Sequence, residues 1–308
     1  MNLWVDGPAI CWKFAHLIKD KDVVGPFLRH LIRTLKLLSL DRMAVFWDAK
    51  RSPRRMKIWP DYKKNRSERK LKDPAFIEAV HSQMDLMRWR VFQALGIPQV
   101  WIDGHEADDL IYAACQVFSE EATLILTTDQ DFIQLVGPLV SVILDLSSGP
   151  KTINTRTLRA ATRTRSAAQF LFLRMLTGDS SDHIPGIGGI GKTDKTGKVW
   201  PILKKCRDLD DLFSRREELR QDPDFKLVFQ PQAIENLMRN QELMDLSLGE
   251  GSDPDVQSQV MTAILEGVGE PSVTSVMKSL SDNPVLASET VNALPYFDRV
   301  VQRMRGTD

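Results

Sequence analysis

Apolar stretches of strand length recur along the first half of this sequence of 308 residues, with helical patterns between them. The apolar stretches occupy residues 3–5, 43–47, 99–102, 123–127 and 140–144, and the helical patterns lie near residues 24–38, 75–95, 107–118 and 131–135. Strands that alternate with helices are typical of an α/β fold with a largely parallel sheet, because parallel neighbours need a crossover connection. We therefore expect an α/β domain over residues 1–150.

Acidic residues follow four of the expected strands at the point where each strand ends. The first strand is followed by Asp6 and the second by Asp48, and an acidic cluster opens the helix after the third. The carboxyl ends of parallel strands form one edge of a sheet, and ligands bind in the crevice outside that edge. We expect these side chains to converge there, together with two acids that precede a glycine-rich segment. The nine acidic residues of this predicted site are Asp6, Asp48, Glu106, Asp108, Asp109, Asp129, Asp131, Asp179 and Asp182.

Nine carboxylates in one crevice would repel one another and raise each other's pKa values unless cations lay between them. Oxygen ligands without histidine or cysteine favour Mg²⁺ or Mn²⁺ over zinc. Two such ions, roughly 3.5–4 Å apart, would stabilise the attacking and leaving oxygens of a phosphodiester hydrolysis. Taken singly, each acid has a simpler explanation as a helix cap, a first-turn acid or a turn residue. The recurrence at four strand ends favours the metal site.

Positive charge is concentrated in one segment although the chain as a whole is neutral. Residues 50–72 contain eleven lysines and arginines against two acids, with Trp59 and Tyr62 among them. Aromatic side chains between basic ones are typical of nucleic-acid binding surfaces. Residues 151–165 add five basic residues, and residues 245–296 hold eight acids and one base, Lys278. The pattern predicts a polyanion bound on one side of the molecule, with nucleic acid as the leading partner.

The second half of the chain is predicted to be mainly helical. Helical patterns cover residues 155–177, 198–214 and 232–246, a glycine-rich segment lies at 186–197, and residues 248–254 are interpreted as a linker. We expect a helical domain over residues 151–250 and an acidic helical extension over 251–308. The extension suits regulation, docking of a partner or a helical lid equally.

Several classes of protein are disfavoured by composition. No apolar stretch approaches the roughly 18 residues of a membrane span, and residues 1–10 read as a strand and not as a signal peptide. The three cysteines, Cys11, Cys115 and Cys206, are far apart and form no C-x-x-C pair, which disfavours a disulfide framework or a zinc knuckle. We expect reduced, buried thiols and a cytoplasmic protein.

Six stretches, in order, resemble the structure-specific 5′-nucleases, the flap endonuclease and 5′–3′ exonuclease family that includes the 5′-nuclease domain of bacterial DNA polymerase I and stand-alone phage enzymes. They are residues 4–7 (WVDG), 46–50 (FWDAK) with Arg55, 62–66 (YKKNR), 106–110 (EADDL), 127–131 (TTDQD) and 178–191 (GDSSDHIPGIGGIG). The length resembles the phage type. The resemblance implies a PIN-like α/β core, a basic helical arch near residues 50–95 and a helical domain with a helix–three-turn–helix element.

The resemblance also implies roles for individual residues. Asp6, Asp48, Glu106, Asp108 and Asp109 match the acids around a first metal, and Asp129, Asp131, Asp179 and Asp182 match those around a second. Lys63 and Arg66 match a basic pair that contacts the scissile phosphate. Arg55 and Tyr62 match positions of the DNA-binding pattern beside the arch.

The glycine-rich segment matches the hairpin that binds the duplex backbone in this family, with a K⁺ ion. Its residues here are Gly186, Gly188, Gly189, Gly191 and Lys192. Glycines let backbone N–H groups approach phosphates, and such contacts position a duplex without selecting its sequence. The sequence departs from the family pattern at His183, where Asn is usual, and at Gly188, where Pro is common. The Lys-Thr pair after the hairpin has two candidates, at 192–193 and at 195–196.

The same segment also satisfies the phosphate-binding loop pattern of ATPases, G-x-x-x-x-G-K-[ST], over residues 186–193. That loop needs a buried strand leading into it and a helix leading out, and residues 179–185 do not read as a strand. We therefore predict a monomeric Mg²⁺-dependent 5′-nuclease acting on 5′ ends, flaps or RNA primers in replication or repair, with replication proteins as partners. The alternatives are a PIN-type ribonuclease and a non-catalytic DNA-binding module.

Overall fold

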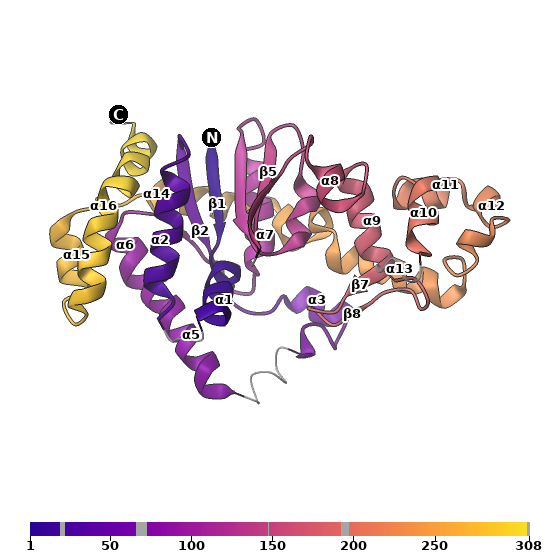
Figure 1. Ribbon diagram of the computed structural model, residues 1–308, viewed down its shortest axis with the longest axis horizontal. Coiled ribbons are helices and arrows are strands. Elements are labelled where there is room, and N and C mark those ends of the chain that lie inside the picture. The colour runs from indigo at the N-terminus through magenta and orange to yellow at the C-terminus, as the bar shows by residue number, and fades with distance from the viewer. Residues whose placement is uncertain (19–21, 66–72, 147, 192–196, 307–308) are drawn as a thin grey trace.

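A six-stranded sheet forms the centre of the computed structural model, which describes residues 1–18, 22–65, 73–146, 148–191 and 197–306 (Figure 1). The strand order is β3-β2-β1-β4-β5-β6, in which the first five strands are parallel and β6 is antiparallel to β5. The strands are β1 (Asn2–Asp6), β2 (Arg42–Phe46), β3 (Gln99–Val100), β4 (Thr123–Thr127), β5 (Val140–Leu146) and β6 (Gly149–Ile153). The expected α/β fold with a largely parallel sheet is confirmed.

Helices cover both faces of the sheet, because its central strands are apolar on both sides. In β1, Leu3 and Val5 point into one hydrophobic core and Trp4 points into the other. The first core is closed by α1 (Gly7–Ile18), α2 (Val24–Leu35), α5 (Pro74–Leu86), α6 (Phe92–Ala94), α15 (Val273–Ser279) and α16 (Pro284–Arg305). The second is closed by α7 (Ala107–Val117), α8 (Leu158–Thr162), α9 (Ala167–Thr177), α10 (Val199–Lys205), α13 (Pro231–Met244) and α14 (Pro254–Glu266).

Shorter elements complete the chain. Figure 1 shows α10, α11 and α12 at the end of the molecule opposite α15 and α16. The shorter elements are α3 (Pro53–Ile58), a π-helical turn η1 (Met87–Val91), the 3₁₀ turns η2 (Gln130–Leu135), η3 (Pro223–Phe225), η4 (Leu246–Leu248) and η5 (Glu250–Ser252), α11 (Leu209–Ser214), α12 (Arg216–Leu219), and the ribbon of β7 (Gly178–Asp179) with β8 (Ile184–Pro185).

Five local expectations are corrected by the structure. The N-terminal strand ends at Asp6 and α1 begins at Gly7, where Pro8 suits a first helical turn. The helix expected over 155–177 is broken at Arg163, whose φ is +64°, and the helix expected over 198–214 is two helices. β6 was not expected, because its sequence is polar as befits an exposed edge strand. Residues 178–179 and 184–185, expected not to be strand, form the short ribbon β7–β8.

The segment expected to be a linker, residues 248–254, is packed against α7. A Cβ atom on Gly251 would lie 2.0 Å from the carbonyl oxygen of Asp109. The acidic C-terminal region that follows is helical as expected, but it belongs to the body of the protein, since α16 packs on α2 and on β2 (Figure 1). Its buried side chains include Leu286, Phe297 and Val301.

The three cysteines are buried and unpaired, as expected. Within the described ranges, the structure contains no helix that is both long enough and apolar enough to cross a bilayer.

Candidate metal centre

Two acids follow directly from the ends of central strands. Asp6 is the last residue of β1, and its carboxylate accepts hydrogen bonds from the Thr127 hydroxyl at 2.6 Å and from the Ala9 amide at 3.2 Å. Asp48 lies two residues beyond β2 and accepts a hydrogen bond of 2.8 Å from the amide of Ala107, in the first turn of α7. The helix N-terminus stabilises a carboxylate at that position.

Three further acids gather at the start of α7. One ligand oxygen from each of Glu106, Asp108 and Asp109 lies within 4.8 Å of the others. Glu106 and Asp109 are buried, whereas Asp108 is partly exposed. Carboxylate oxygens grouped in this way are the ligands that a hard divalent cation prefers.

Arg55, from α3, lies inside this acidic group. Its Nη1 atom donates to Glu106 at 2.7 Å, to Asp109 at 2.9 Å and to Asp108 at 3.2 Å, and Nη2 donates to the second oxygen of Asp109 at 2.9 Å. The side chain is 2% exposed. We expected Arg55 to contact DNA, but the structure places it between the acids and away from solvent. Both oxygens of Asp109 are therefore already bound by the guanidinium.

Tyr62 and Lys63 connect this group to the second one. The Tyr62 hydroxyl donates to Glu106 at 2.8 Å, and Lys63 Nζ lies 2.9 Å from the other oxygen of Glu106. The backbone amide of Lys63, where φ is +54°, donates to the carbonyl oxygen of Asp182 at 2.9 Å. The two expected groups of acids thus meet at this loop. Arg66, the other half of the expected basic pair, lies outside the described residues.

The second group of acids is built around Arg174 of α9. Arg174 lies 2.7 Å from Asp131 and also forms an ion pair with Asp179. Asp129 caps η2 by accepting a hydrogen bond of 2.8 Å from the Asp131 amide. The sequence interpretation missed Arg174. Its signal was a single cation in the otherwise apolar stretch of residues 170–176, directly before Asp179.

Burial outweighs the nearby cations at most of these acids, and Glu106 is an exception. Burial and the nearby Asp48 carboxylate raise the pKa of Asp6 to about 7, against the effect of the Thr127 hydrogen bond. Burial and Asp131 raise the pKa of Asp129 well above its usual value, and burial raises the pKa of Asp131 to about 6 although Arg174 opposes it. Burial acts to raise the pKa of Glu106 as well, but Lys63 and Arg55 outweigh it and hold this pKa at about 2.

These shifts show that the arginines and the lysine do not neutralise the site. Asp48 also has a raised pKa, from burial and from Glu106 and Asp108, although Lys63 opposes the rise. The Asp108 carboxylate contributes to the raised pKa of Asp6, and the carboxylates of Asp6 and Asp182 contribute to that of Asp129. The two groups of acids therefore adjoin. Because every donor is a carboxylate oxygen, the residues fit hard divalent cations, which would stabilise the ionised acids.

The glycine-rich segment follows the ribbon β7–β8 and folds back on α9. The Ile187 amide donates to the carbonyl oxygen of Leu176 at 2.9 Å. Gly178 has φ of +69°, and a Cβ atom there would lie 2.3 Å from the Gly186 amide nitrogen. A Cβ on Gly188 would meet no described atom within 4 Å, so the hairpin backbone is accessible there. The two-residue ribbon is not the buried strand of an ATPase loop. Lys192 lies outside the described residues.

Comparison with known proteins places this chain in a family. The model of the 5′–3′ exonuclease N-terminal, resolvase-like domain matches residues 5–165. A 5′–3′ exonuclease of Bacillus subtilis is 31% identical over 225 residues, which cover 68% of this chain and 72% of that protein. DNA polymerase I of Chloroflexus aurantiacus is 31% identical over 227 residues, which cover 68% of this chain but 23% of the polymerase.

Solved structures agree on the fold. A T5 protein crystallised with metal ions has a TM-score of 0.72 at 22% identity, covering 87% of this chain and 100% of that one. The flap endonuclease of bacteriophage T5, in a complex with DNA and metal ions, has a TM-score of 0.65 at 20% identity over 97% of this chain and 100% of that one. The present chain belongs to the 5′–3′ exonuclease family.

Proposed function

We propose that this chain is a metal-dependent, structure-specific 5′-nuclease. It hydrolyses phosphodiesters near 5′ ends or flap junctions of DNA or RNA–DNA duplexes, as a 5′–3′ exonuclease and flap endonuclease in replication or repair. The observation that carries the proposal is the convergence of two adjoining groups of carboxylates at one edge of a parallel sheet. The relatives named as 5′–3′ exonucleases and the T5 flap endonuclease support the same activity.

The proposed cofactors are two Mg²⁺ or Mn²⁺ ions. Asp6, Asp48, Glu106 and Asp108 are the proposed ligands of the first, and Asp129, Asp131, Asp179 and Asp182 those of the second. Two such ions supply an activated water and stabilise the leaving oxygen in a phosphodiester displacement. Asp109 also matches the family's first group. The oxygens of both Glu106 and Asp109 are bound by basic or hydroxyl side chains, but Asp109 is fully buried and both of its oxygens accept from Arg55 alone, so we assign it to positioning that arginine.

Two buried arginines orient the proposed ligands. Arg55 fixes the acids at the start of α7, and Arg174 fixes Asp131 and Asp179. Lys63 is proposed to act on the substrate, because it lines the same cavity as Asp48 and Glu106. There it would neutralise charge that develops on the transferring phosphate, as would Arg66 by family resemblance.

Duplex DNA is proposed to bind at the hairpin of residues 186–191, between α9 and α10, as a helix–three-turn–helix element with a K⁺ ion. The accessible backbone at Gly188 supports this assignment, because backbone amides there can approach phosphates. We further propose that the protein acts as a cytoplasmic monomer at the nucleoid. Acidic side chains on α14 and α16 are the proposed contact for a replication protein.

A substrate panel tests the activity. The wild type should cleave 5′-flap, nicked and RNA–DNA duplexes in Mg²⁺, cleave single strands poorly and be inactive in EDTA. Asp48→Asn should abolish cleavage while duplex binding stays within about tenfold, because affinity comes mainly from basic groups. Asp103→Asn is the matched control, since Asp103 is exposed and paired with Lys50 outside the acidic groups. Cleavage in EDTA, or an active Asp48→Asn variant, would contradict the proposal.

A further inference from the structure

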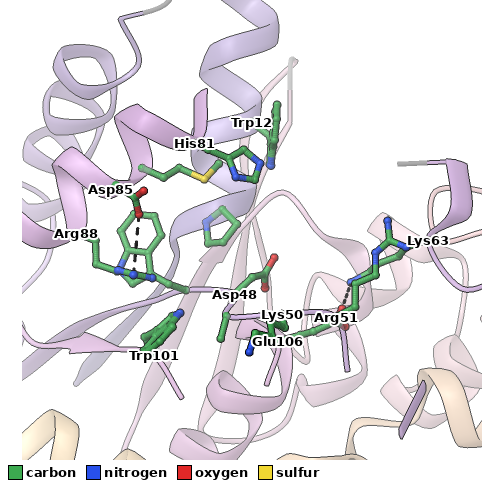
Figure 2. Close-up of a pocket in the computed structure, with 14 residues that line it drawn as sticks. Trp12, Asp48, Lys50, Arg51, Lys63, His81, Asp85, Arg88, Trp101 and Glu106 are labelled. Carbon is green, nitrogen blue, oxygen red and sulfur yellow. Dashed lines mark ion pairs between the residues drawn. The ribbon is translucent and has the colours of Figure 1, made fainter. Parts of the chain in front are cut away.

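A cavity of about 370 Å³ lies beside the acids of the proposed first metal. Asp48, Glu106 and Lys63 form part of its wall, and Trp12, Arg88 and Trp101 form another part. Figure 2 shows Arg88 and Trp101 at one end of the cavity, Lys63 at the other, and Asp48 between them. The volume lies in the range of about 300–1,000 Å³ typical of ligand pockets. The proposed chemistry uses the acidic wall and leaves the aromatic wall without a role.

Arg88 is poorly neutralised for a guanidinium with so little exposure. Its side chain is 12% exposed, and its ion pair with Asp85 is 4.0 Å long, to a carboxylate that is itself mostly exposed. Its Nε atom is buried without a hydrogen-bond partner among the residues that the structure describes. Burial lowers the pKa of Arg88, because the charged form is desolvated and Asp85 compensates only in part. An anion in the cavity would compensate the charge of Arg88 that Asp85 compensates only in part.

Two tryptophans hold this guanidinium. Its central carbon lies 4.1 Å from the ring centre of Trp89 and 4.8 Å from that of Trp101. Trp101 lines the cavity and is 40% exposed, whereas Trp89, which is 52% exposed, does not line it. Arg88 and Trp89 lie in η1, a π-helical turn that interrupts the helix between α5 and α6. Such turns occur frequently at functional sites.

A partly exposed aromatic ring beside a poorly neutralised cation matches a nucleotide, which has a flat base and a phosphate. We propose that the cavity holds the unpaired nucleotide on the 5′ side of the scissile phosphate, with its base against Trp101 and its phosphate on Arg88. This inference rests on the proposed function, since it places the released strand next to the metal ligands. A free nucleotide has the same chemistry, but the continuity of the cavity with Asp48 and Lys63 favours a nucleotide of the substrate strand.

The test uses three duplexes that carry a one-nucleotide 5′ flap. The first has a normal base and a 5′-phosphate, the second an abasic site and a 5′-phosphate, and the third a normal base and a 5′-hydroxyl. Binding is measured by fluorescence anisotropy in EDTA and cleavage by single-turnover rates in Mg²⁺. The wild type should bind the first duplex at least about fivefold more tightly than the other two, as expected for one base stack or one charged contact.

Each substitution should remove one preference only. Trp101→Ala should abolish the difference between the normal and abasic flaps, and Arg88→Gln should abolish the difference between phosphate and hydroxyl. Trp89→Ala is the matched control and should keep the base preference, because Trp89 lies outside the cavity. Equal binding of all three duplexes by the wild type, or equal weakening of all three by both variants, would overturn the proposal.

Two further outcomes are distinguishable. Deoxynucleoside monophosphate at millimolar concentration should not displace the flap duplex from the wild type. Displacement that depends on Arg88 would identify a free-nucleotide site and overturn the assignment to the strand. A wild type that shows the binding preferences but cleaves nothing in Mg²⁺ would refute the proposed nuclease activity and leave the nucleotide site standing.

Discussion

Removing the Arg55 side chain should strongly lower the free energy of unfolding. Its guanidinium makes four hydrogen bonds of 2.7–3.2 Å to three carboxylates at a position that is 2% exposed. Arg55→Met keeps most of the volume and removes the guanidinium from all three carboxylates, of which Glu106 retains its ion pair with Lys63. Breaking a buried ion pair by removing one partner costs about 3–5 kcal/mol, because the remaining charge stays buried and uncompensated. An unfolding entropy of about 2.1 cal/mol/K per residue gives about 1.5 °C per kcal/mol for 308 residues, so the melting temperature should fall by about 5–8 °C.

The assay is thermal unfolding in EDTA followed by circular dichroism, so that no metal replaces the lost charge. Lys57→Met is the matched control, since Lys57 is an exposed cation on the same helix, α3, and its substitution should change stability by less than about 0.5 kcal/mol. Asp109→Asn should cost less in the Arg55→Met background than in the wild type, because the two side chains share their hydrogen bonds. A melting temperature of Arg55→Met within 2 °C of the wild type would show that the hydrogen bonds of Arg55 contribute little to stability.

Three further predictions concern the same site. In EDTA, Asp108→Asn should melt at a higher temperature than the wild type, because it removes one of several neighbouring negative charges. Mg²⁺ should raise the melting temperature of the wild type more than that of the variant, because the ions bind only the native state. A wild-type melting temperature that does not respond to millimolar Mg²⁺ would count against the metal site. Lys63→Ala should lower the single-turnover rate at least about tenfold more than it weakens flap binding, whereas Lys57→Ala, at an exposed position outside the cavity, should affect both slightly. Equal losses of rate and binding in Lys63→Ala would show that Lys63 does not act on the transferring phosphate. Gly178→Ala should destabilise the fold by more than about 2 kcal/mol in chemical denaturation, since its Cβ would meet the Gly186 backbone and its φ is positive. A neutral effect would show that the ribbon β7–β8 is not packed as described.

The strands and the acids at their ends were predictable because both follow from local pattern. Apolar runs such as residues 123–127 have the length of buried strands, and the acids come directly after them. Parallel topology then brings Asp6, Asp48 and Asp129 to one edge without further information. Edge strand β6 escaped prediction because it is solvent-exposed along most of its length and carries no apolar signal.

The cations within the site could not be assigned from local pattern. Arg55 meets Asp109 across 54 residues and Arg174 meets Asp131 across 43, so each pairing depends on how distant elements pack. In the sequence, Arg55 belongs to a basic run and reads as a surface residue, whereas burial in the structure makes it part of the acidic group. The packing of the C-terminal region into the body of the protein was not predicted for the same reason, because the contact of α16 with α2 joins segments more than 200 residues apart.

Metal binding at the two groups of acids can be tested by anomalous diffraction from crystals grown with Mn²⁺. Two manganese peaks are expected, one bounded by Asp48 and Asp108 and the other by Asp129 and Asp131, and the first peak should be lost in Asp48→Asn crystals. Crystals with no peak between these carboxylates, or with manganese bound only outside them, would contradict metal binding at these acids.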